Sequence, residues 1–299
     1  MLSALLVTIL PPHLEHSLKT QLVLLGTGTP RLDPERSGPA AAVVVDGAAY
    51  LVDCGPGTVR RAAAARLNGI SALAPVNIKT VFITHLHSDH TLGYPDLILS
   101  PWVVGRKDHL SAYGPAGLAN MTSHLLKAYQ EDIDIRTEGL EHGNKTGYMV
   151  DVHEIKPGVV YKDDKVVVTA FYVKHGSWKE AFGFKFQTSD RTIVFSGDTS
   201  PSGEVEAAAM GADILVHEVY EDGEASSENR AGGADWPEYM RTFHTSASEL
   251  GAIAARCKPK LLVLTHILRR GGSDTRLLEE IRSGGFQGEV VVGNDLKTY

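Results

Sequence analysis

The sequence predicts an α/β fold in which short strands alternate with helices and turns. Short runs of apolar or β-branched residues recur along the chain between Gly- and Pro-rich turns, which is the pattern of buried strands. Segments with apolar residues at helical spacing lie between some of these runs. With 299 residues, of which 43% are hydrophobic, the chain is long enough to bury a large core without disulfides.

The first series of elements begins near Gln21. Apolar runs predict strands in QLVLLGTGTP, AAAVVVDG and AAYLVDCGPG. An Ala- and Arg-rich segment then predicts a helix, and KTVFITH predicts a fourth strand. In the middle third, apolar residues at helical spacing place one stripe of a helix on a core, and these residues are Leu118, Met121, Leu125 and Tyr129.

A second series of strands begins at Lys165. Its strands are predicted in KVVVTAFYVKH, AFGFKFQ, TIVFSGD, ADILVHE and KLLVLTH, with a helix in SASELGAIAARC before the last strand. Several of these strands end on or next to a His or an Asp. Because ligands of sheet-and-helix proteins bind beyond the carboxyl ends of strands, this recurrence predicts one shared functional rim.

No linker divides the chain, so we expect one domain over residues 21–299, preceded by an N-terminal extension over residues 1–20. The apolar run from Leu2 to Leu10 is too short to span a bilayer, and it lacks the basic start and the cleavage site of an export signal. We therefore expect a cytoplasmic protein with no membrane partner, and export on a signal remnant is the alternative. Cys54 and Cys257 lack metal-ligand spacing, which favours reduced, buried thiols.

The charge balance argues against a wide surface for polyanions. The chain has 36 acidic and 29 basic residues, a net charge of −7 at pH 7. Such a balance provides no extended basic footprint for the phosphates of a nucleic acid, although it is compatible with a local basic patch. We therefore do not expect a long nucleic acid as a partner.

The strongest chemical signal is HLHSDH, which follows the apolar strand VFIT directly. On an extended segment His85 and His87 point to the same side, and the turn through Asp89 and His90 can aim two further ligands at a nearby point. A single histidine in such a loop would be interpreted as solvated or as a helix cap. Three histidines and one aspartate after a buried strand instead predict a site that can serve two metal ions.

This segment matches the HxHxDH signature of the metallo-β-lactamase superfamily, and the chain resembles that family from about Gln21 onward. Later family motifs have candidates in the expected order: a strand-ending His (His175), a Gly-Asp after a strand (Asp198) and a final strand-ending His (His266). The resemblance implies a four-layer αββα sandwich. It also implies that one ion is held by His85, His87 and His175, that the other is held by Asp89, His90 and His266, and that Asp198 bridges them.

Neutral imidazoles and carboxylates suit zinc, and a bridging carboxylate offsets the repulsion between two dications about 3.5–4 Å apart. We therefore expect two Zn²⁺ per chain, with manganese and iron as alternatives. A hydroxide shared by the ions would serve a hydrolase as its nucleophile. His87 favours hydrolysis, because oxygen-reducing di-iron relatives carry an acidic residue there. Asp53 matches a family aspartate that orients a ligand imidazole, and a strand-end turn former is its alternative.

Two further motifs resemble the ribonuclease Z and arylsulfatase-like branch of the superfamily. HEVY, which contains Glu218, and HTSA, which begins with His244, occur in the order of that branch, and GTGTP and DCGPGT also match it. The resemblance implies that Glu218 orients His244 beside the ions, where His244 stabilises charge or protonates the leaving group. We name both as catalytic residues together with the metal ligand Asp89. For His244 alone, capping of the helix that starts near Ser246 is the alternative.

The substrate follows from the same resemblance. tRNA-processing members carry a protruding Gly- and Pro-rich arm, whereas the stretch between His90 and His175 predicts a compact helical segment. We therefore expect a small or medium anionic ester as substrate, either a phosphodiester or a sulfate ester. A lactonase or β-lactamase is the alternative enzyme, and a non-catalytic metal-binding scaffold is the least favoured hypothesis because every ligand candidate is present. A homodimer is an expectation from the family alone.

Overall fold

A computed structural model of the protein describes residues 19–225, 235–269 and 271–299. The expected N-terminal extension over residues 1–20 lies outside these ranges, except for Lys19 and Thr20, and Thr20 is already the first residue of the first strand. Within the described ranges, no helix combines the length and apolar character that crossing a membrane requires.

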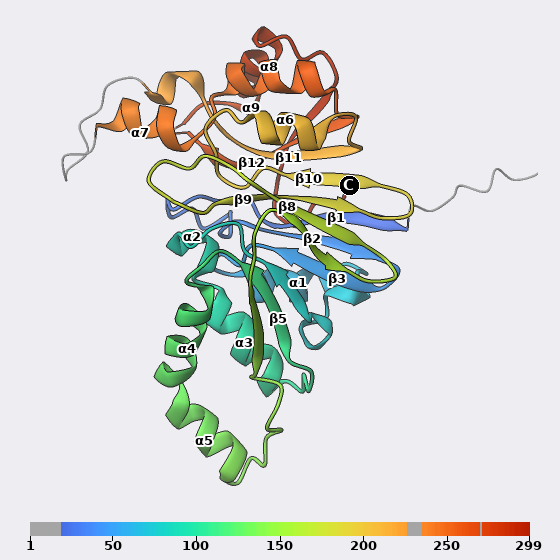
Figure 1. Cartoon of the computed structure of the whole chain (residues 1–299), viewed down its shortest axis with the longest axis vertical. Helices are drawn as coiled ribbons and strands as arrows, with labels where there is room; N and C mark the ends of the chain where they lie inside the picture. The colour runs from blue at the N-terminus through green and yellow to red at the C-terminus, as the bar shows by residue number, and fades with distance from the viewer. Residues whose placement is uncertain (1–18, 226–234, 270) are drawn as a thin grey trace, which may run out of the picture.

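Two mixed β-sheets face each other at the centre of the molecule (Figure 1). The first sheet has the order β1-β2-β3-β4-β5-β6 and the second β13-β12-β11-β10-β9-β8-β7. The strands of the first sheet are β1 (Thr20–Gly26), β2 (Ala40–Val45), β3 (Ala48–Val52), β4 (Thr80–Phe82), β5 (Leu110–Gly114) and β6 (Val150–Glu154). Those of the second are β7 (Gly158–Lys162), β8 (Val167–Tyr172), β9 (Phe182–Gln187), β10 (Thr192–Phe195), β11 (Ile214–Tyr220), β12 (Leu261–Leu268) and β13 (Glu289–Val292).

Each sheet is antiparallel at one end and parallel at the other. In the first sheet β1, β2 and β3 pair antiparallel, and β3 to β6 pair parallel. In the second, β7 to β10 pair antiparallel and β10 to β13 parallel. Neighbouring parallel strands end at the same edge of a sheet, so the loops after them can build one site there.

Helices cover both outer faces, and the expected four-layer αββα sandwich is confirmed (Figure 1). The first sheet is covered by α1 (Thr58–Leu67) and α3 (Tyr94–Val103). The second is covered by α6 (Gly203–Ala209), α8 (Ala247–Cys257) and α9 (Asp274–Ser283). The other helices are α2 (Ser88–Thr91), α4 (Leu118–Ala128), α5 (Gln130–Glu138) and α7 (Trp236–Phe243), with short 3₁₀ turns at Ser71–Leu73, Pro75–Asn77 and Asp222–Ala225.

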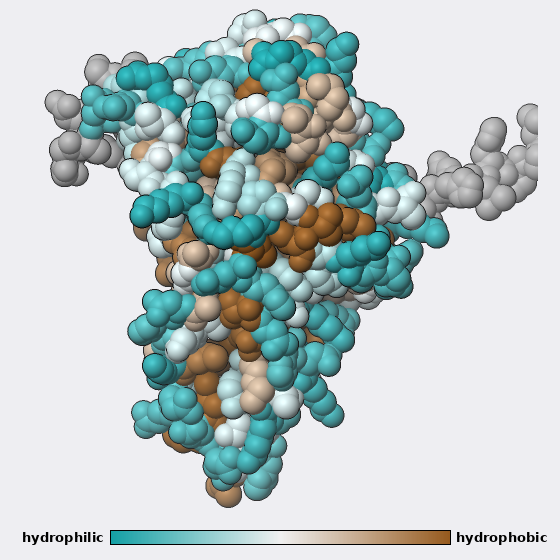
Figure 2. Space-filling model, viewed as in Figure 1, coloured by the Kyte–Doolittle hydropathy of each residue, from teal (hydrophilic) through white to brown (hydrophobic). Residues whose placement is uncertain are grey.

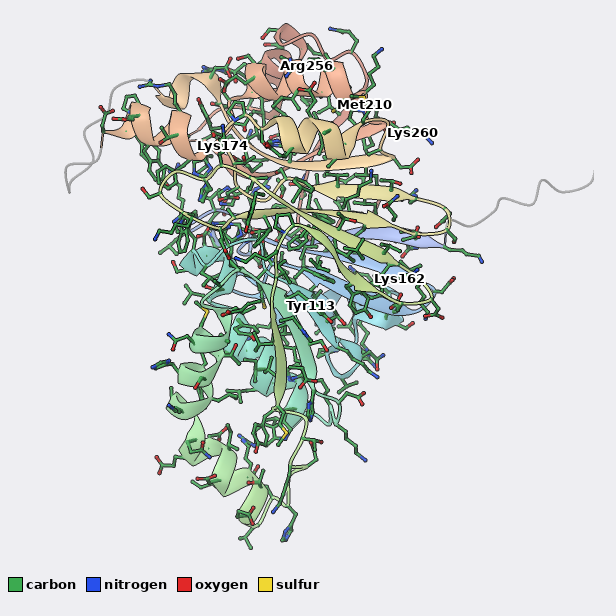
Figure 3. The ribbon with its side chains drawn as sticks, viewed as in Figure 1. Tyr113, Lys162, Lys174, Met210, Arg256 and Lys260 are labelled. Atoms are coloured by element: carbon green, nitrogen blue, oxygen red, sulfur yellow. The ribbon has the colours of Figure 1, made fainter. Side chains whose placement is uncertain are left out.

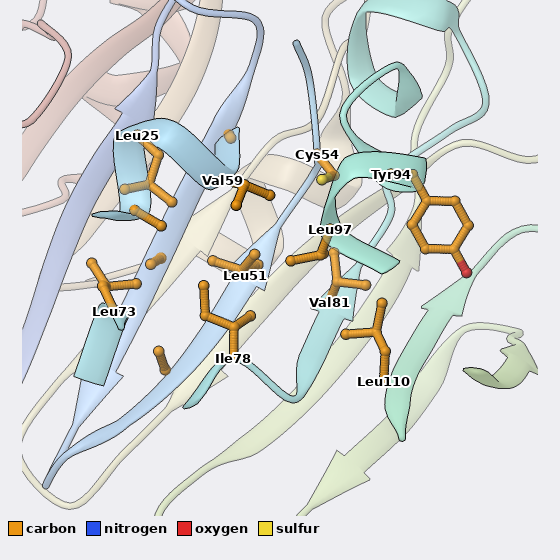
Figure 4. Packing of buried hydrophobic residues seen from close by; sticks show 14 of the residues in the cluster. Leu25, Leu51, Cys54, Val59, Leu73, Ile78, Val81, Tyr94, Leu97 and Leu110 are labelled. Atoms are coloured by element: carbon orange, nitrogen blue, oxygen red, sulfur yellow. The ribbon is translucent and has the colours of Figure 1, made fainter. Parts of the chain in front are cut away.

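The apolar core lies in the three spaces between the layers. Side chains alternate across each strand, so Val81 packs between the first sheet and its helices with Leu51 and Leu97 (Figure 4), while Phe82 points between the sheets. A third cluster joins the second sheet to α8 and α9. Cys54 and Cys257 are buried in different clusters and unpaired, as expected for structural thiols.

The stretch between His90 and His175 is not the compact helical segment expected from its sequence. Besides β8, which is the strand predicted in KVVVTAFYVKH, it contains β5 and β6, which extend the first sheet, and β7, the edge strand of the second sheet. The edge strands β6 and β7 are largely exposed and carry polar residues, so they lack the long apolar run that marks a strand. α4 and α5 project from the body of the sandwich, and Figure 2 shows hydrophobic surface between α4 and the sheet as well as a second hydrophobic patch near the middle of this face.

Candidate metal centre

The loops that follow several strands converge at one edge of the two sheets. The HLHSDH segment leaves β4 and enters α2. His175 follows β8, Asp198 follows β10, and His266 lies near the end of β12. The candidate ligands are buried, except for His87, which is half-buried.

His85, His87 and His175 form the first group, which we call the outer group. Nδ1 of His87 lies 2.9 Å from Nε2 of His85 and 3.0 Å from Nε2 of His175. Nδ1 of His175 donates to the backbone carbonyl of Phe243 at 2.7 Å, so Nε2 of this neutral ring keeps a lone pair. Trp178 donates its indole N–H to Nε2 of His87 at 2.8 Å.

Asp89, His90 and His266 form the inner group, with Asp198 against it. Nε2 of His266 lies 3.2 Å from Oδ2 of Asp89 and 3.3 Å from Oδ2 of Asp198. Nε2 of His90 lies 3.3 Å from Oδ2 of Asp198, and it is buried without a hydrogen-bond partner. Ligand atoms placed tetrahedrally at zinc distances are about 3.3 Å apart, so this spacing fits a zinc-sized ion.

Asp198 connects the two groups. Each residue of the outer group offers one potential ligand atom, and these atoms lie within 4.8 Å of one another. The same is true, separately, of the inner group. A third such set joins Asp198 to His85 and His90, one residue from each group. Buried imidazole and carboxylate donors at these separations suit divalent transition metals.

Asp53 sits directly behind the inner group. Its Oδ2 accepts a hydrogen bond from Nδ1 of His90 at 2.8 Å, and its Oδ1 accepts the backbone N–H of Thr84 at 2.8 Å. The Thr84 hydroxyl contacts both the Asp53 carboxylate and Nδ1 of His85, at 2.9 and 3.0 Å. Asp53 has a φ of 61°, a left-handed conformation that non-glycine residues seldom adopt outside constrained sites. The carboxylate thus contacts one ligand ring directly and a second through Thr84.

His266 reaches the centre because β12 bulges beside it. β11 pairs Glu218 with Thr265 and Val219 with Ile267, which leaves His266 out of register, with a φ of 43°. An extra residue in a strand redirects its side chain. The strand continues to Leu268, beyond His266, where the sequence predicts its end.

Burial and charge act differently on the individual groups. Burial lowers the pKa of His175 to about 3 and the pKa of His85 well below its usual range. Burial alone would raise the pKa of Asp198, but His266 and His90 hold it well below its usual range. At pH 7 the first two rings are therefore neutral and Asp198 is ionised, as metal ligation requires.

Glu218 and His244 lie beside the inner group. Oε1 of Glu218 accepts the backbone N–H groups of Thr199 and Thr245, each at 3.1 Å. Oε2 lies 3.3 Å from Nδ1 of His244. Burial, with Asp198, raises the pKa of Glu218 well above its usual range, and burial lowers the pKa of His244 to about 3. Two amides therefore hold Glu218 against the imidazole that it was expected to orient.

His244 does not cap the helix that follows it. The N-cap of α8 is Ser246, whose side chain accepts the backbone N–H of Glu249 in a capping box. His244 instead ends α7, and its side chain lines a cavity over the candidate ligands.

This cavity has a volume of about 380 Å³. It is lined by Thr29, Pro30, Arg31, His87, Asp89, Asp198, Trp236, Tyr239, His244, His266, Leu268 and Arg269. The sequence did not point to Arg31 and Arg269, because each lies in or next to a loop and neither belongs to a recognisable motif. Trp236 and Tyr239 belong to α7, a helix that the sequence analysis did not predict.

Residues 48–267 match the family described as Beta-lactamase superfamily domain. A ribonuclease Z from Mycobacterium bovis (strain BCG / Pasteur 1173P2) is 32% identical over 281 residues, covering 92% of this chain and 96% of that protein. A ribonuclease Z from Mycobacterium sp. (strain KMS) is 36% identical over 255 residues, covering 83% of this chain and 84% of that protein.

Solved structures agree with the fold. The metallo-beta-lactamase fold protein YhfI from Bacillus subtilis superimposes with a TM-score of 0.70 at 18% identity, covering 94% of this chain and 98% of that one. The short form of human tRNase Z superimposes with a TM-score of 0.68 at 24% identity, covering 93% of this chain and 98% of that one.

The expectation that a long nucleic acid is not a partner is wrong. Relatives that are 32% and 36% identical over most of the chain are ribonucleases. The net charge of −7 was misleading because it averages over the whole chain. Arg31 and Arg269 lie in the lining of the cavity over the candidate ligands, so this cavity has local positive charge that the net charge does not reveal.

Proposed function

The chain belongs to the metallo-β-lactamase superfamily and is homologous to ribonucleases Z, and from this premise we propose that it is a dinuclear zinc phosphodiesterase that cleaves RNA. Membership makes it a metal-dependent hydrolase. The observation that carries the finer proposal is the convergence of two ligand groups on one cavity, with Asp198 between them and the Glu218–His244 pair beside them.

The outer group would hold one zinc ion and the inner group another, with the Asp198 carboxylate lying between the two groups. When bound, zinc would supply Lewis acidity, which makes a nucleophile available from water at neutral pH and stabilises negative charge on a phosphoryl oxygen. The contribution of the protein's other residues is to orient the ligand rings. Asp53 directs Nε2 of His90 into the centre, and the Phe243 carbonyl does the same for Nε2 of His175.

His244 is proposed to act on the leaving group. Its ring lies between those of Tyr239 and His266, at centroid distances of 5.6 and 5.7 Å, and its Nδ1 faces Glu218. Nε2 is then the ring atom available to a substrate in the cavity. From there it can donate a hydrogen bond to developing negative charge, or pass its Nε2 proton to the departing oxygen while Nδ1 takes the proton of Glu218, whose pKa is raised by burial.

Metal analysis combined with a substrate panel tests the proposal. Protein purified without added metal or chelator should contain about two zinc ions per chain, and His87→Ala should lose at least one ion and the activity. The zinc-loaded protein should cleave a tRNA transcript, a short RNA and bis(4-nitrophenyl) phosphate. A zinc content near zero after reconstitution would contradict the metal assignment. Turnover of nitrophenyl sulfate or a lactone without cleavage of any phosphodiester would contradict the substrate assignment.

A further inference from the structure

A second cavity, of about 400 Å³, adjoins the one over the candidate ligands. The two cavities share Thr29, Arg31 and Arg269 in their linings. The rest of the second cavity is lined by Thr27, Gly28, Leu32, Asp33, Pro34, Arg36, Ile267 and Gly271. A substrate bound at the metal centre can therefore continue past the two shared arginines.

The lining of the second cavity is basic. It contains three arginines and one aspartate, in a chain whose net charge is −7. Arg36 is committed to the protein itself, because its guanidinium donates to the Thr27 hydroxyl, the Gly293 carbonyl and the Asn294 side chain. Arg31 and Arg269 are the two arginines that line both cavities.

Asp274 holds the guanidinium of Arg269 in place, but one nitrogen of that guanidinium donates no hydrogen bond. Its Nη2 donates to Oδ1 of Asp274 at 2.7 Å, whereas its Nη1 is buried without a hydrogen-bond partner. A buried charged N–H without an acceptor is unfavourable, so an anion accepted at Nη1 would be stabilised. Arg31 donates from Nη1 to the backbone carbonyl of Arg269 at 3.1 Å and is otherwise exposed. Arg31 is thereby tethered next to Arg269 with other donors free for a ligand.

We propose that Arg31 and Arg269 bind the phosphate that neighbours the scissile one in an RNA strand. This inference rests on the proposed function. A guanidinium presents paired donors that match a phosphate, and its charge persists at any physiological pH. The two arginines are positioning and specificity residues, because they meet the substrate beside the reacting phosphate.

Two substrates that differ by one phosphate test this subsite. A dinucleoside monophosphate places its only phosphate at the metal centre, whereas a trinucleoside diphosphate has a second phosphate for the arginines. The unmodified protein should have the lower KM for the trinucleotide. In Arg269→Ala and in Arg31→Ala, KM for the trinucleotide should rise about 10-fold more than KM for the dinucleotide. An equal rise for both substrates would overturn the proposal.

Arg256→Ala is the matched control. Arg256 pairs with Glu206 at 2.8 Å, much as Arg269 pairs with Asp274 at 2.7 Å, but it lies in the outer helical layer on α8 (Figure 3). Its loss should leave both KM values unchanged. Arg269→Lys keeps the charge without the paired donors and should fall between the native protein and Arg269→Ala.

A binding measurement separates this proposal from the proposed function. The probe is a fluorescein-labelled trinucleotide with phosphorothioate linkages, which resist hydrolysis, and its anisotropy is followed with the full-length protein as purified. Kd should rise about 10-fold in both arginine variants, and the dependence of log Kd on log salt should weaken by about one unit. If the variants lose binding but the native protein cleaves no phosphodiester, the phosphate subsite is confirmed and the proposed function is wrong. If cleavage persists and binding is unchanged in the variants, the subsite fails alone.

Discussion

His90 and His87 belong to the same short motif, but the protein holds their rings in different ways. His90 is buried, and its Nδ1 donates to the Asp53 carboxylate at 2.8 Å, which directs Nε2 toward Asp198. Burial lowers the pKa of His90, but the Asp198 and Asp53 carboxylates outweigh it and hold that pKa well above its usual range. His87 is half-buried, and its Nε2 accepts the Trp178 indole N–H at 2.8 Å. Because a neutral imidazole carries one proton, the proton of His87 is then on Nδ1, the atom that faces His85 and His175.

The difference indicates that the two ligand groups are prepared to different degrees. In the inner group a carboxylate already fixes the orientation of the His90 ring and holds a proton on Nδ1, so Nε2 is the atom that faces the centre and becomes a ligand when it releases its proton. The outer group must release the proton from Nδ1 of His87 and lose the Trp178 hydrogen bond before that atom can act as a ligand. We therefore expect zinc to bind more tightly at the inner group, and the following four variants test this comparison.

Asp198→Ala should have the largest effect, because Asp198 belongs to both halves of the centre. Its Oδ2 lies 3.3 Å from Nε2 of His90 in the inner group, and its carboxylate forms one potential ligand set with His90 and with His85 of the outer group. Removing this charge should release both ions and reduce phosphodiester turnover to background, as read by elemental analysis and by assay with bis(4-nitrophenyl) phosphate. Asp198→Asn keeps the shape and should retain part of the metal. Full activity in Asp198→Ala would place the centre elsewhere.

His244→Ala should keep both ions yet lose about 10²- to 10⁴-fold in turnover. The loss should shrink for substrates with a nitrophenolate leaving group, which needs no proton, and grow for alkoxide leaving groups. Glu218→Gln should follow the same trend more weakly. Unchanged turnover on every ester, with metal content intact, would remove His244 from the mechanism.

Asp53→Ala should weaken zinc binding about 10- to 100-fold, mainly at the inner group, since the carboxylate no longer holds His90. A zinc titration should show the tighter of two binding steps moving to higher concentration. Circular dichroism on the same sample separates this effect from unfolding. A folded variant with the native titration would assign Asp53 to the strand-end turn alone.

Trp178→Phe should have the smallest effect, in the opposite direction. Removing the indole N–H leaves Nε2 of His87 free to carry the proton, so zinc should bind the outer group about 2- to 10-fold more tightly. Trp102→Phe is the matched control, because that indole donates to the Asn144 carbonyl at 2.8 Å within a different part of the fold. Identical titrations for the native protein and Trp178→Phe would show that the two groups do not differ in this way.

Local sequence patterns were enough to predict most of the fold. The strands β8 to β12 are apolar runs bounded by turns, and most of these runs end beside a residue of the centre, so both the sheet and its functional edge could be inferred from the sequence. β6 and β7 were missed because an edge strand buries little and carries polar residues. α7 begins directly after an unpatterned polar stretch and was missed for lack of a long periodic run.

The sequence by itself determined the family and the candidate ligands, because imidazole and carboxylate chemistry depends on residue type and HLHSDH places four candidates in one short segment. Only the tertiary structure decided which ring nitrogen faces the centre, through hydrogen bonds from Asp53, Phe243 and Trp178 that span long stretches of chain. It also brought Arg31 next to Arg269. Such contacts join residues far apart in the chain, and neither residue type nor spacing encodes them.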